Sequence, residues 1–376
     1  MYILHTAHLP LHSYFDVESM FSPQELLNPY PHKPRVTYKN GRFKLSVFSD
    51  LHYGEAEDLS WGPEQDRNSD TVMRAILKID PPDYVVINGD LITGENTFRE
   101  NSTLYMDRLL TPLINANIPF SSTYGNHDNR PNISHLAEME REVKLAPLSY
   151  SRRAPPGVGG IGGEANYWVP VYADKSARSP CLVLWFFDSR GGYTSGPNST
   201  ALPDWVDESV APWIQQESAA MDSAWGSATE TGRQALVFAH IPPSTMRKLQ
   251  QSLNSSKEPG LNADQLGSGS TQGSNNPTSV GKELAWWYAV RDYIKNIHAT
   301  VHGHAHGNEW CARDPSTSII LCFNKHTGYG GYSSPDWGHG VRTFDFKLGE
   351  ESAHTYIRMQ NGSTHAEVVL DKQYGI

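Results

Sequence analysis

Apolar and polar positions alternate in a regular way along the first half of the chain. Apolar runs bounded by turn residues predict strands at 43–49, 84–88 and 119–124. Stretches whose apolar residues recur with a helical period predict helices at 66–79, 103–114 and 133–145. Strands and helices in this order are typical of parallel strands joined by helical crossovers. The first half therefore predicts an α/β fold.

The second half continues the alternation with a more antiparallel character. Helices are predicted at 206–225 and 283–297, and strands at 182–187, 235–239 and 299–302. Later apolar runs predict the strands of a sheet edge at 319–323, 341–346, 355–359 and 367–370. Residues 254–281 are rich in Ser, Gly, Asn and Pro and have no apolar period, which predicts a long mobile loop.

The same pattern predicts the domain organisation. The first forty residues are rich in Pro and aromatic side chains and have no clear period. They predict an extended N-terminal arm, 1–42, that wraps around the domain. No internal repeat and no convincing boundary follows, so residues 43–376 predict one domain.

Composition and charge exclude several classes of protein. The 376 residues carry a formal net charge of −10, whereas binding to a nucleic acid scaffold needs a basic surface. No apolar run reaches the length of a membrane span, and the N-terminus lacks the pattern of a signal peptide. The compartment stays open. Five Asn-x-Ser/Thr sequons favour the secretory route slightly, although chance supplies several: Asn101, Asn132, Asn198, Asn254 and Asn361.

Cysteine is sparse, with only Cys181, Cys311 and Cys322. So small and odd a number excludes the disulfide scaffold of a small secreted protein. Cys311 and Cys322 flank a turn signal at 314–316 and could face each other across a hairpin. A bridge between them and a pair of buried thiols are both compatible with the sequence.

Ligand-type side chains follow five of the predicted strands. Because the carboxyl ends of strands converge in open α/β sheets, we expect these side chains to meet at one place. Any one of these motifs is common by chance, and an isolated histidine is more often packed than metal-bound, but all five in this order at strand ends are not expected by chance. The five segments are Asp50-Leu51-His52, Gly89-Asp90, Gly125-Asn126-His127-Asp128, Ala239-His240 and Gly303-His304-Ala305-His306.

The residue types in these segments predict a pair of metal ions. Carboxylate oxygen, imidazole nitrogen and amide oxygen suit Fe, Mn or Zn, and the absence of thiolates argues against a structural zinc site. Two cations about 3.5–4 Å apart need a bridging anion, which one carboxylate can supply. A glycine before Asp90, Asn126 and His304 allows close approach of the backbone.

These segments resemble the motifs of the calcineurin-like metallophosphoesterase superfamily, over about residues 43–306. Within it, residues 89–96, 240–242 and 328–332 resemble fungal and plant purple-acid-phosphatase-like proteins. The resemblance implies two packed mixed β-sheets flanked by helices, a four-layer α-β-β-α sandwich, with two metals at one edge. It also implies that 43–376 is a catalytic domain.

The resemblance further implies a role for each residue. Asp90 would bridge the metals, and His127 would contact the phosphate and protonate the leaving oxygen; an orienting role for His127 is the alternative. Thr93 stands where purple acid phosphatases have a metal-binding tyrosine, so no iron–tyrosinate is expected and Fe, Mn and Zn all stay open. The first metal would be held by Asp50, His52 and His306, and the second by Asn126, His240 and His304.

The expected function is hydrolysis of a phosphate ester by a metal-activated hydroxide, with a monoester favoured. The substrate would be a phosphorylated small molecule or a phosphoprotein. A phosphodiesterase acting on nucleotide or glycerophospho substrates is one alternative, and a non-catalytic binding protein on the same fold is another.

Several further residues have two interpretations. Arg130 and Arg190 could each clamp phosphate or form an ordinary salt bridge. Tyr329 and Tyr332 could line the cleft or be turn residues. An aromatic face at 286–288 is more typical of a core than of a cofactor site.

Overall fold

The computed structural model of the chain describes residues 28–56 and 60–376. Residues 1–27 of the predicted arm lie outside this range. In the rest of the arm, the short strand β1 (Val36–Thr37) pairs in parallel with Val171 and Tyr172 of strand β5 (Tyr167–Tyr172). The division into an arm and one domain stays a prediction.

The first half of the chain contains the alternation that its pattern predicts, with ends shifted by up to five residues. The Ser134 side chain accepts a hydrogen bond from the Ala137 amide at 3.3 Å and caps the last helix of this series. The elements are β2 (Arg42–Phe48), α2 (Trp61–Ile79), β3 (Tyr84–Asn88), η1 (Gly94–Asn96), α3 (Ser102–Ala116), β4 (Phe120–Thr123) and α4 (His135–Leu145).

The second half contains the predicted strands and several elements that the pattern does not predict. The extra elements of this half are β5, α6, α7, η2 and β9, and the first half contains the further elements β1 and η1. After β5 come β6 (Pro180–Phe187), α5 (Val210–Trp225), α6 (Ala228–Thr231), β7 (Gln234–Ala239), α7 (Thr245–Ser252), η2 (Pro277–Ser279), α8 (Leu284–Tyr293) and β8 (Ile297–His302). The C-terminal strands are β9 (Cys311–Arg313), β10 (Ile320–Phe323), β11 (Gly340–Lys347), β12 (Ala353–Met359) and β13 (Thr364–Leu370).

Two predictions in this half are wrong in part. The helix predicted at 283–297 ends at Tyr293, because Asn296 takes a left-handed backbone with a φ of 52° and β8 begins at Ile297. The strand predicted at 319–323 does not share a sheet with the three that follow it. Residues 254–281 contain η2 and a bridge between Asn262 and Asn308, and their predicted mobility stays a prediction.

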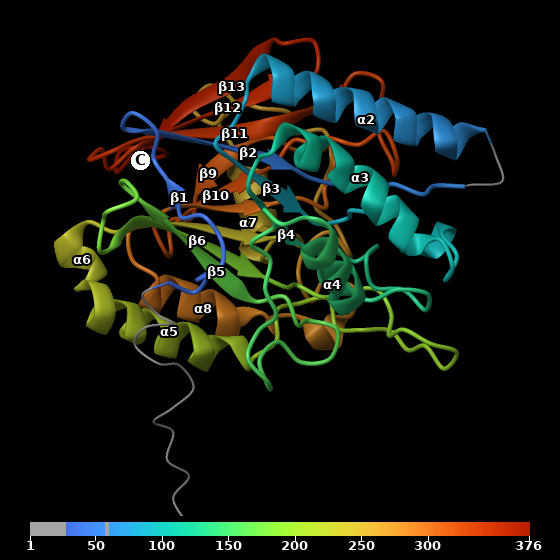
Figure 1. Cartoon of the computed structure of the whole chain (residues 1–376), viewed down its shortest axis with the longest axis horizontal. Coiled ribbons are helices and arrows are strands. Elements are labelled where there is room, and N and C mark those ends of the chain that lie inside the picture. The colour runs from blue at the N-terminus through green and yellow to red at the C-terminus, as the bar shows by residue number, and fades with distance from the viewer. Residues whose placement is uncertain (1–27, 57–59) are drawn as a thin grey trace, which may run out of the picture.

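The strands form two mixed sheets that pack face to face. One sheet has the order β1-β5-β6-β7-β8-β10-β9, and the other has the order β13-β12-β11-β2-β3-β4. Strands β2, β3 and β4 run parallel in one sheet, and β6, β7, β8 and β10 run parallel in the other. Helices α2 and α3 lie on one side of the pair and α5 and α8 on the other (Figure 1). The predicted fold class is therefore confirmed.

Three apolar clusters fill the spaces between these four layers. Between the sheets, Leu45 and Val86 of one sheet belong to the same cluster as Leu184 and Phe238 of the other. The outer clusters join α2, α3 and α4 to the six-stranded sheet, and α5, α7 and α8 to the seven-stranded sheet. Within the described ranges, none of the helices has both the length and the hydropathy that a bilayer crossing requires.

The aromatic face of α8 belongs to one of these clusters. Trp286 and Trp287 are buried in it, as expected for core residues, whereas Tyr288 is 44% exposed. Cys311 and Cys322 face each other between β9 and β10 and form a disulfide, so the bridge is the alternative that the structure contains.

A buried arginine ties the two sheets together. Arg342 on β11 is 1% exposed and donates from Nε to the Phe323 carbonyl of β10 at 2.7 Å. Its Nη1 donates to Thr355 Oγ1 at 3.1 Å, and its Nη2 donates to the Glu309 carbonyl. The guanidinium therefore satisfies two buried carbonyl groups, one on β10 of the opposite sheet and one in the segment that precedes β9.

We expect Arg342→Met to lower the free energy of unfolding by about 3 kcal/mol. The substitution keeps an apolar stem but leaves two buried carbonyls without a donor, and each such group costs about 1–3 kcal/mol. Urea unfolding measures the difference. Arg42→Met is the matched control, because Arg42 pairs with Asp345 on the surface and its side chain is 62% exposed; this loss should stay under about 1 kcal/mol. Equal losses would contradict the role of Arg342.

Candidate metal centre

The predicted ligand residues come from both sheets and meet where the parallel strands end. Asp50 and His52 follow β2, Asp90 follows β3 and Asn126 follows β4. From the opposite sheet, His240 follows β7, while His304 and His306 follow β8. The carboxyl ends of two parallel strand groups thus face one centre, as expected for a site in an α/β protein.

Four of these residues hold an unusual backbone conformation. Asp50, His52, Asp90 and His304 have φ angles of 53°, 49°, 51° and 73°. A residue with a Cβ pays about 1–3 kcal/mol in such a region, and proteins keep this strain mainly at functional sites. The Asp90 carbonyl accepts from the Leu51 amide at 2.8 Å and the His52 amide at 3.0 Å, which locks the two turns together.

The glycines that precede three of the ligand-type residues leave room for neighbouring groups of the site. A Cβ at each of them would lie 2.3 Å from a polar atom, closer than side-chain atoms approach in proteins. The atoms in question are His240 Nδ1 for Gly89, Asp90 Oδ1 for Gly125 and Ser49 Oγ for Gly303. Glycine is therefore needed here for space as well as for the turn.

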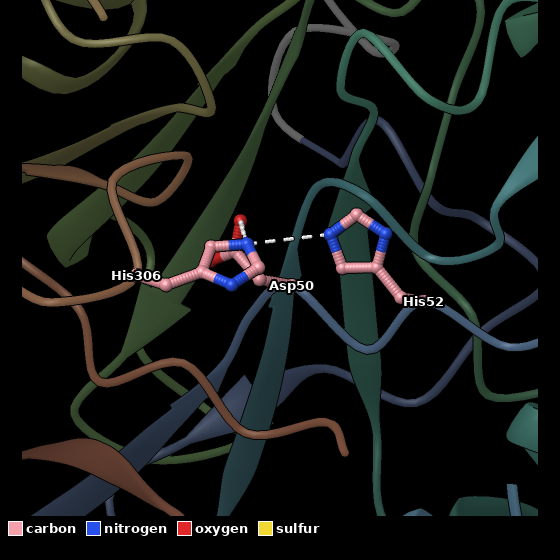
Figure 2. Close-up of side chains that lie close together, drawn as sticks. All are labelled: Asp50, His52 and His306. Carbon is pink, nitrogen blue, oxygen red and sulfur yellow. Dashed lines mark hydrogen bonds and ion pairs between the residues drawn. The ribbon is translucent and has the colours of Figure 1, made fainter. Parts of the chain in front are cut away.

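Asp50, His52 and His306 form a first group of inward-facing ligand atoms (Figure 2). Nε2 of His52 lies 3.3 Å from Nε2 of His306, and the latter lies 3.5 Å from Asp50 Oδ1. All three side chains are at most 3% exposed. Each contributes one ligand atom, and these atoms lie within 4.8 Å of one another.

Asp90, His240 and His304 form a second group with the same compactness. Nε2 of His240 lies 3.0 Å from Asp90 Oδ2, and the same oxygen lies 3.7 Å from His52 Nε2 of the first group. Asp90 therefore stands between the groups. Oδ1 of Asn126 is buried and has no hydrogen-bond partner among the described residues. An unpaired buried amide oxygen is costly unless a ligand satisfies it.

The second nitrogen of each imidazole makes a hydrogen bond away from the centre. His240 Nδ1 donates to the Asn88 carbonyl at 2.8 Å, His304 Nε2 to the Gly269 carbonyl at 2.8 Å, and His306 Nδ1 to the Tyr332 carbonyl at 2.6 Å. Carbonyls only accept, so these nitrogens carry the hydrogen. In the neutral ring, the inward nitrogen is then a bare lone pair.

His52 obtains the same orientation through a side-chain relay. Its Nδ1 lies 2.9 Å from Thr93 Oγ1, and that hydroxyl donates to Glu55 Oε1 at 2.8 Å. Because the hydroxyl hydrogen is used on Glu55, the Thr93 oxygen accepts from His52. The threonine that replaces the tyrosine of purple acid phosphatases thus orients an imidazole.

Burial and charge make the centre electron-rich. Burial lowers the pKa of His52 to about 3 and that of His304 to about 4, so both rings are neutral. Burial opposes ionisation of Asp50, but His306 and His240 outweigh it and lower its pKa to about 2. Burial lowers the pKa of His240, but Asp90 and Asp50 outweigh it and raise it to about 10. One ring thus takes up a proton to offset carboxylate charge.

This donor set fits metal ions. The inward lone pairs of His52 and His306 face each other at 3.3 Å, an arrangement that repels unless a cation lies beside them. Imidazole nitrogen, carboxylate oxygen and amide oxygen are ligands of Zn, Mn and Fe. Outward hydrogen bonds from ligating histidines to carbonyls are a usual feature of such sites.

His127 lies at the rim of the centre. Its amide donates to Asp90 Oδ1 at 2.9 Å, and its ring centroid lies 4.9 Å from that of His52. Nδ1 pairs with Glu95 Oε1 at 2.6 Å, which leaves Nε2 for another partner. Burial lowers the pKa of His127, but Asp90 and Glu95 outweigh this effect and raise it. Arg130 pairs with the same Glu95 oxygen at 2.9 Å.

Arg190, Tyr329 and Tyr332 also have two interpretations, and the structure gives each of them different partners. Arg190 is 3% exposed and bonds to Asp207 at 3.0 Å and to the Trp205 carbonyl at 2.8 Å, so it forms a structural salt bridge rather than a phosphate clamp. Tyr329 bonds to Gln360. Tyr332 lies at the centre, where its hydroxyl accepts from the His306 amide at 3.0 Å and its ring stacks on His306 at 4.1 Å.

Sequence reasoning missed the residues that hold these segments in place. Asp128 accepts hydrogen bonds from the amides of Leu91, Ile92 and Gly125 at 2.7–3.1 Å and joins two ligand turns. Its place in the Gly-Asn-His-Asp motif could have indicated this role. The buried His135 bonds to Asp188 and to the Gly125 carbonyl. No local pattern reveals that pair, because 53 positions separate its members.

Comparison with known proteins assigns the chain to a family. Its sequence matches the family model of the calcineurin-like phosphoesterases over residues 43–308. The chain belongs to the calcineurin-like phosphoesterase family. This confirms the resemblance that the motifs predict, and members of the family act on phosphorylated substrates.

Relatives of this chain occur in fungi and plants. It is 26% identical over 343 residues to phosphatase DCR2 of Saccharomyces cerevisiae. This match covers 86% of this chain and 54% of the yeast protein. The chain thus spans about half the length of that relative. It is also 26% identical over 347 residues to probable inactive purple acid phosphatase 28 of Arabidopsis thaliana, covering 85% of this chain and 79% of the plant protein.

The fold of the chain also has a solved counterpart. The crystal structure of a dimetal phosphatase from Danio rerio matches with a TM-score of 0.53 at 14% sequence identity. The match covers 88% of this chain and 99% of that one. At this identity the likeness shows the fold, which is that of dimetal phosphoesterases.

We expect Thr93→Val to weaken metal binding by about 10–100-fold, the range found when a ligand's outer hydrogen bond is removed. Valine has the shape of threonine but gives His52 Nδ1 no acceptor. Isothermal titration of the metal-free protein with Zn²⁺ or Mn²⁺ measures the change. Thr93→Ser keeps the hydroxyl and is the matched control, with near-normal affinity. Equal affinity for the valine variant would exclude the relay to Glu55.

Proposed function

We propose that this chain is a dinuclear-metal phosphoesterase that hydrolyses phosphate monoesters. The observation that carries the proposal is the set of inward nitrogens: three buried imidazoles and the half-buried His304, each with its second nitrogen already bonded, around two carboxylates. In this proposal Asp90 would serve both metals. Asp50, His52 and His306 would hold one metal, and Asn126, His240 and His304 would hold the other.

The side chains of this protein would orient the substrate and move one proton. When bound, two metal ions lower the pKa of a shared water and bind the phosphoryl oxygens. His127, with Nδ1 tied to Glu95, presents Nε2 to the oxygen of the departing group and protonates it. General acid catalysis of this kind contributes about 10²–10⁴-fold.

A monoester is favoured over a diester because of the permanent charge beside the centre. Arg130 lies next to His127, with its Nη2 3.3 Å from His127 Nδ1. A monoester dianion carries one more negative charge than a diester, and would gain more from the metal ions and from Arg130, whose charge Glu95 offsets only in part.

A non-catalytic binding protein is the second candidate. The name of the Arabidopsis relative, a probable inactive purple acid phosphatase, motivates it. The complete set of seven ligand-type residues, together with His127, supports the enzyme instead.

Metal analysis combined with a substrate test distinguishes the candidates. We expect about two metal ions per chain by elemental analysis after loading with Mn²⁺, Zn²⁺ or Fe. The loaded protein should hydrolyse para-nitrophenyl phosphate faster than its bis-ester. Chelation should abolish the activity, and addition of metal should restore it. Two bound metals with activity on neither ester would favour the binding protein, and faster hydrolysis of the bis-ester would favour a diesterase.

We expect His127→Asn to lower kcat by about 10²–10⁴-fold while metal content stays the same, because the variant loses the proton donor but no ligand. Steady-state kinetics and elemental analysis on the same preparation measure both quantities. His32→Asn, at an exposed position, is the control. Loss of metal in the His127 variant would place this residue in the coordination sphere.

A further inference from the structure

A pocket of about 490 Å³ opens directly beside the candidate metal centre. Asn126 and His304, which belong to the second proposed metal site, form part of its wall. Apolar and aromatic side chains make up much of the remainder, including Tyr193, Leu202 and Ile241. A group attached to a phosphate at the centre would have room here.

The charges on the pocket wall are few and already paired. Arg130 is the only basic residue among the described residues that line it, and it is bound to Glu95. Asp204 is the only acidic one among them, and its Oδ2 accepts from Asn275 Nδ2 at 2.8 Å. The pocket therefore offers no free cation for a second phosphate and suits an uncharged group.

Tyr193 contributes an aromatic ring to the pocket wall. Tyr193 is 44% exposed, and the Arg130 guanidinium lies 5.5 Å from its ring centroid. The Tyr193 amide donates to the Asn129 carbonyl at 2.9 Å. The preceding Gly192 packs so closely that a Cβ there would lie 2.5 Å from the Asn126 carbonyl oxygen. The backbone that carries the ring is thus held against Asn126 and Asn129.

Arg130 places the pocket next to His127. This residue lines the pocket and lies 3.3 Å from His127 Nδ1. A substituent on the oxygen that His127 protonates can reach this pocket, because the wall of the pocket includes Asn126 and His304 of the centre as well as Arg130.

We propose that this pocket binds the leaving group and that the preferred substrates are monophosphate esters of uncharged phenols, such as tyrosyl phosphate. The proposal rests on the proposed function. In the reaction, water adds to phosphorus and the bond from phosphorus to the phenolic oxygen breaks. The electron pair stays on that oxygen, which His127 protonates, and the products are the phenol and inorganic phosphate. Tyr193 binds the ring of the phenol by stacking.

The test compares aryl and alkyl phosphates in wild type and Tyr193→Ala. The substrates are phenyl phosphate and O-phosphotyrosine against glycerol 2-phosphate and O-phosphoserine. We expect the ratio of kcat/KM for aryl over alkyl esters to fall about tenfold in the variant, mainly through KM. Each variant is compared with wild type on the same substrate, so differences in leaving-group acidity cancel. Tyr193→Phe should restore the ratio, because phenylalanine keeps the stacking surface.

Tyr288→Ala is the matched control. Tyr288 has the same 44% exposure and also lies under an arginine, with Arg291 4.7 Å from its ring centroid, but it lies on α8 and does not line the pocket. Its loss should leave the ratio unchanged. If Tyr193→Ala unfolds, Ala201→Trp serves instead, because it fills the pocket and should also lower the ratio.

The outcomes separate the two proposals. Absence of wild-type activity on all four esters, with metals bound, would overturn the proposed function. Wild-type activity with an unchanged aryl-to-alkyl ratio in the folded Tyr193→Ala variant would overturn the aryl preference alone.

Discussion

The repulsion among buried lone pairs and carboxylates is the interaction on which the rest of this structure depends. Imidazoles from both sheets converge on Asp50 and Asp90, where water cannot screen the charge, and the His240 ring takes up a single proton against two carboxylates. Such a centre is stable only if positive charge enters it. Cation binding would then offset the left-handed backbone at Asp90 and His304 as well, since the same contacts would fix both the ions and the strained turns.

The arrangement of strands gives this centre its rigidity. Each ligand turn leaves a buried strand, and each sheet contributes only part of the set, so the sandwich must be complete before the centre exists. Arg342 and the inter-sheet cluster therefore support the chemistry although they lie away from it. Gly89, Gly125 and Gly303 have a related role. The space that a side chain would need at each of them is already filled by another ligand-type residue or by Ser49, which bonds to one.

The sequence predicts the fold class and the ligand turns because their signals are local. A ligand-type residue after an apolar run is visible in a few positions, and residues such as Asp90 and His240 need no partner to be recognised. The supporting contacts are not local. Thr93 has a role only because β2 brings His52 to it, and the sequence leaves Arg190 open between a phosphate clamp and a salt bridge because its partner Asp207 lies 17 positions away. Strand β5 was missed because it contains Pro170, which is tolerated since β1 reaches only Val171 and Tyr172 on that side.

The bond from His304 to the Gly269 carbonyl has a consequence for how this chain can vary. By composition, residues 254–281 resemble a spacer whose length is free. The Gly269 carbonyl nevertheless orients the His304 ring. The Gln272 side chain, three residues later, donates to the Ile241 carbonyl, so these two contacts fix the position of the loop between Gly269 and Gln272. Insertions are tolerable toward the exposed start near Asn254, whereas a single added residue around Gly269 would rotate the ring. The number of residues in this part of the loop is therefore as restricted as it is in a strand of the core.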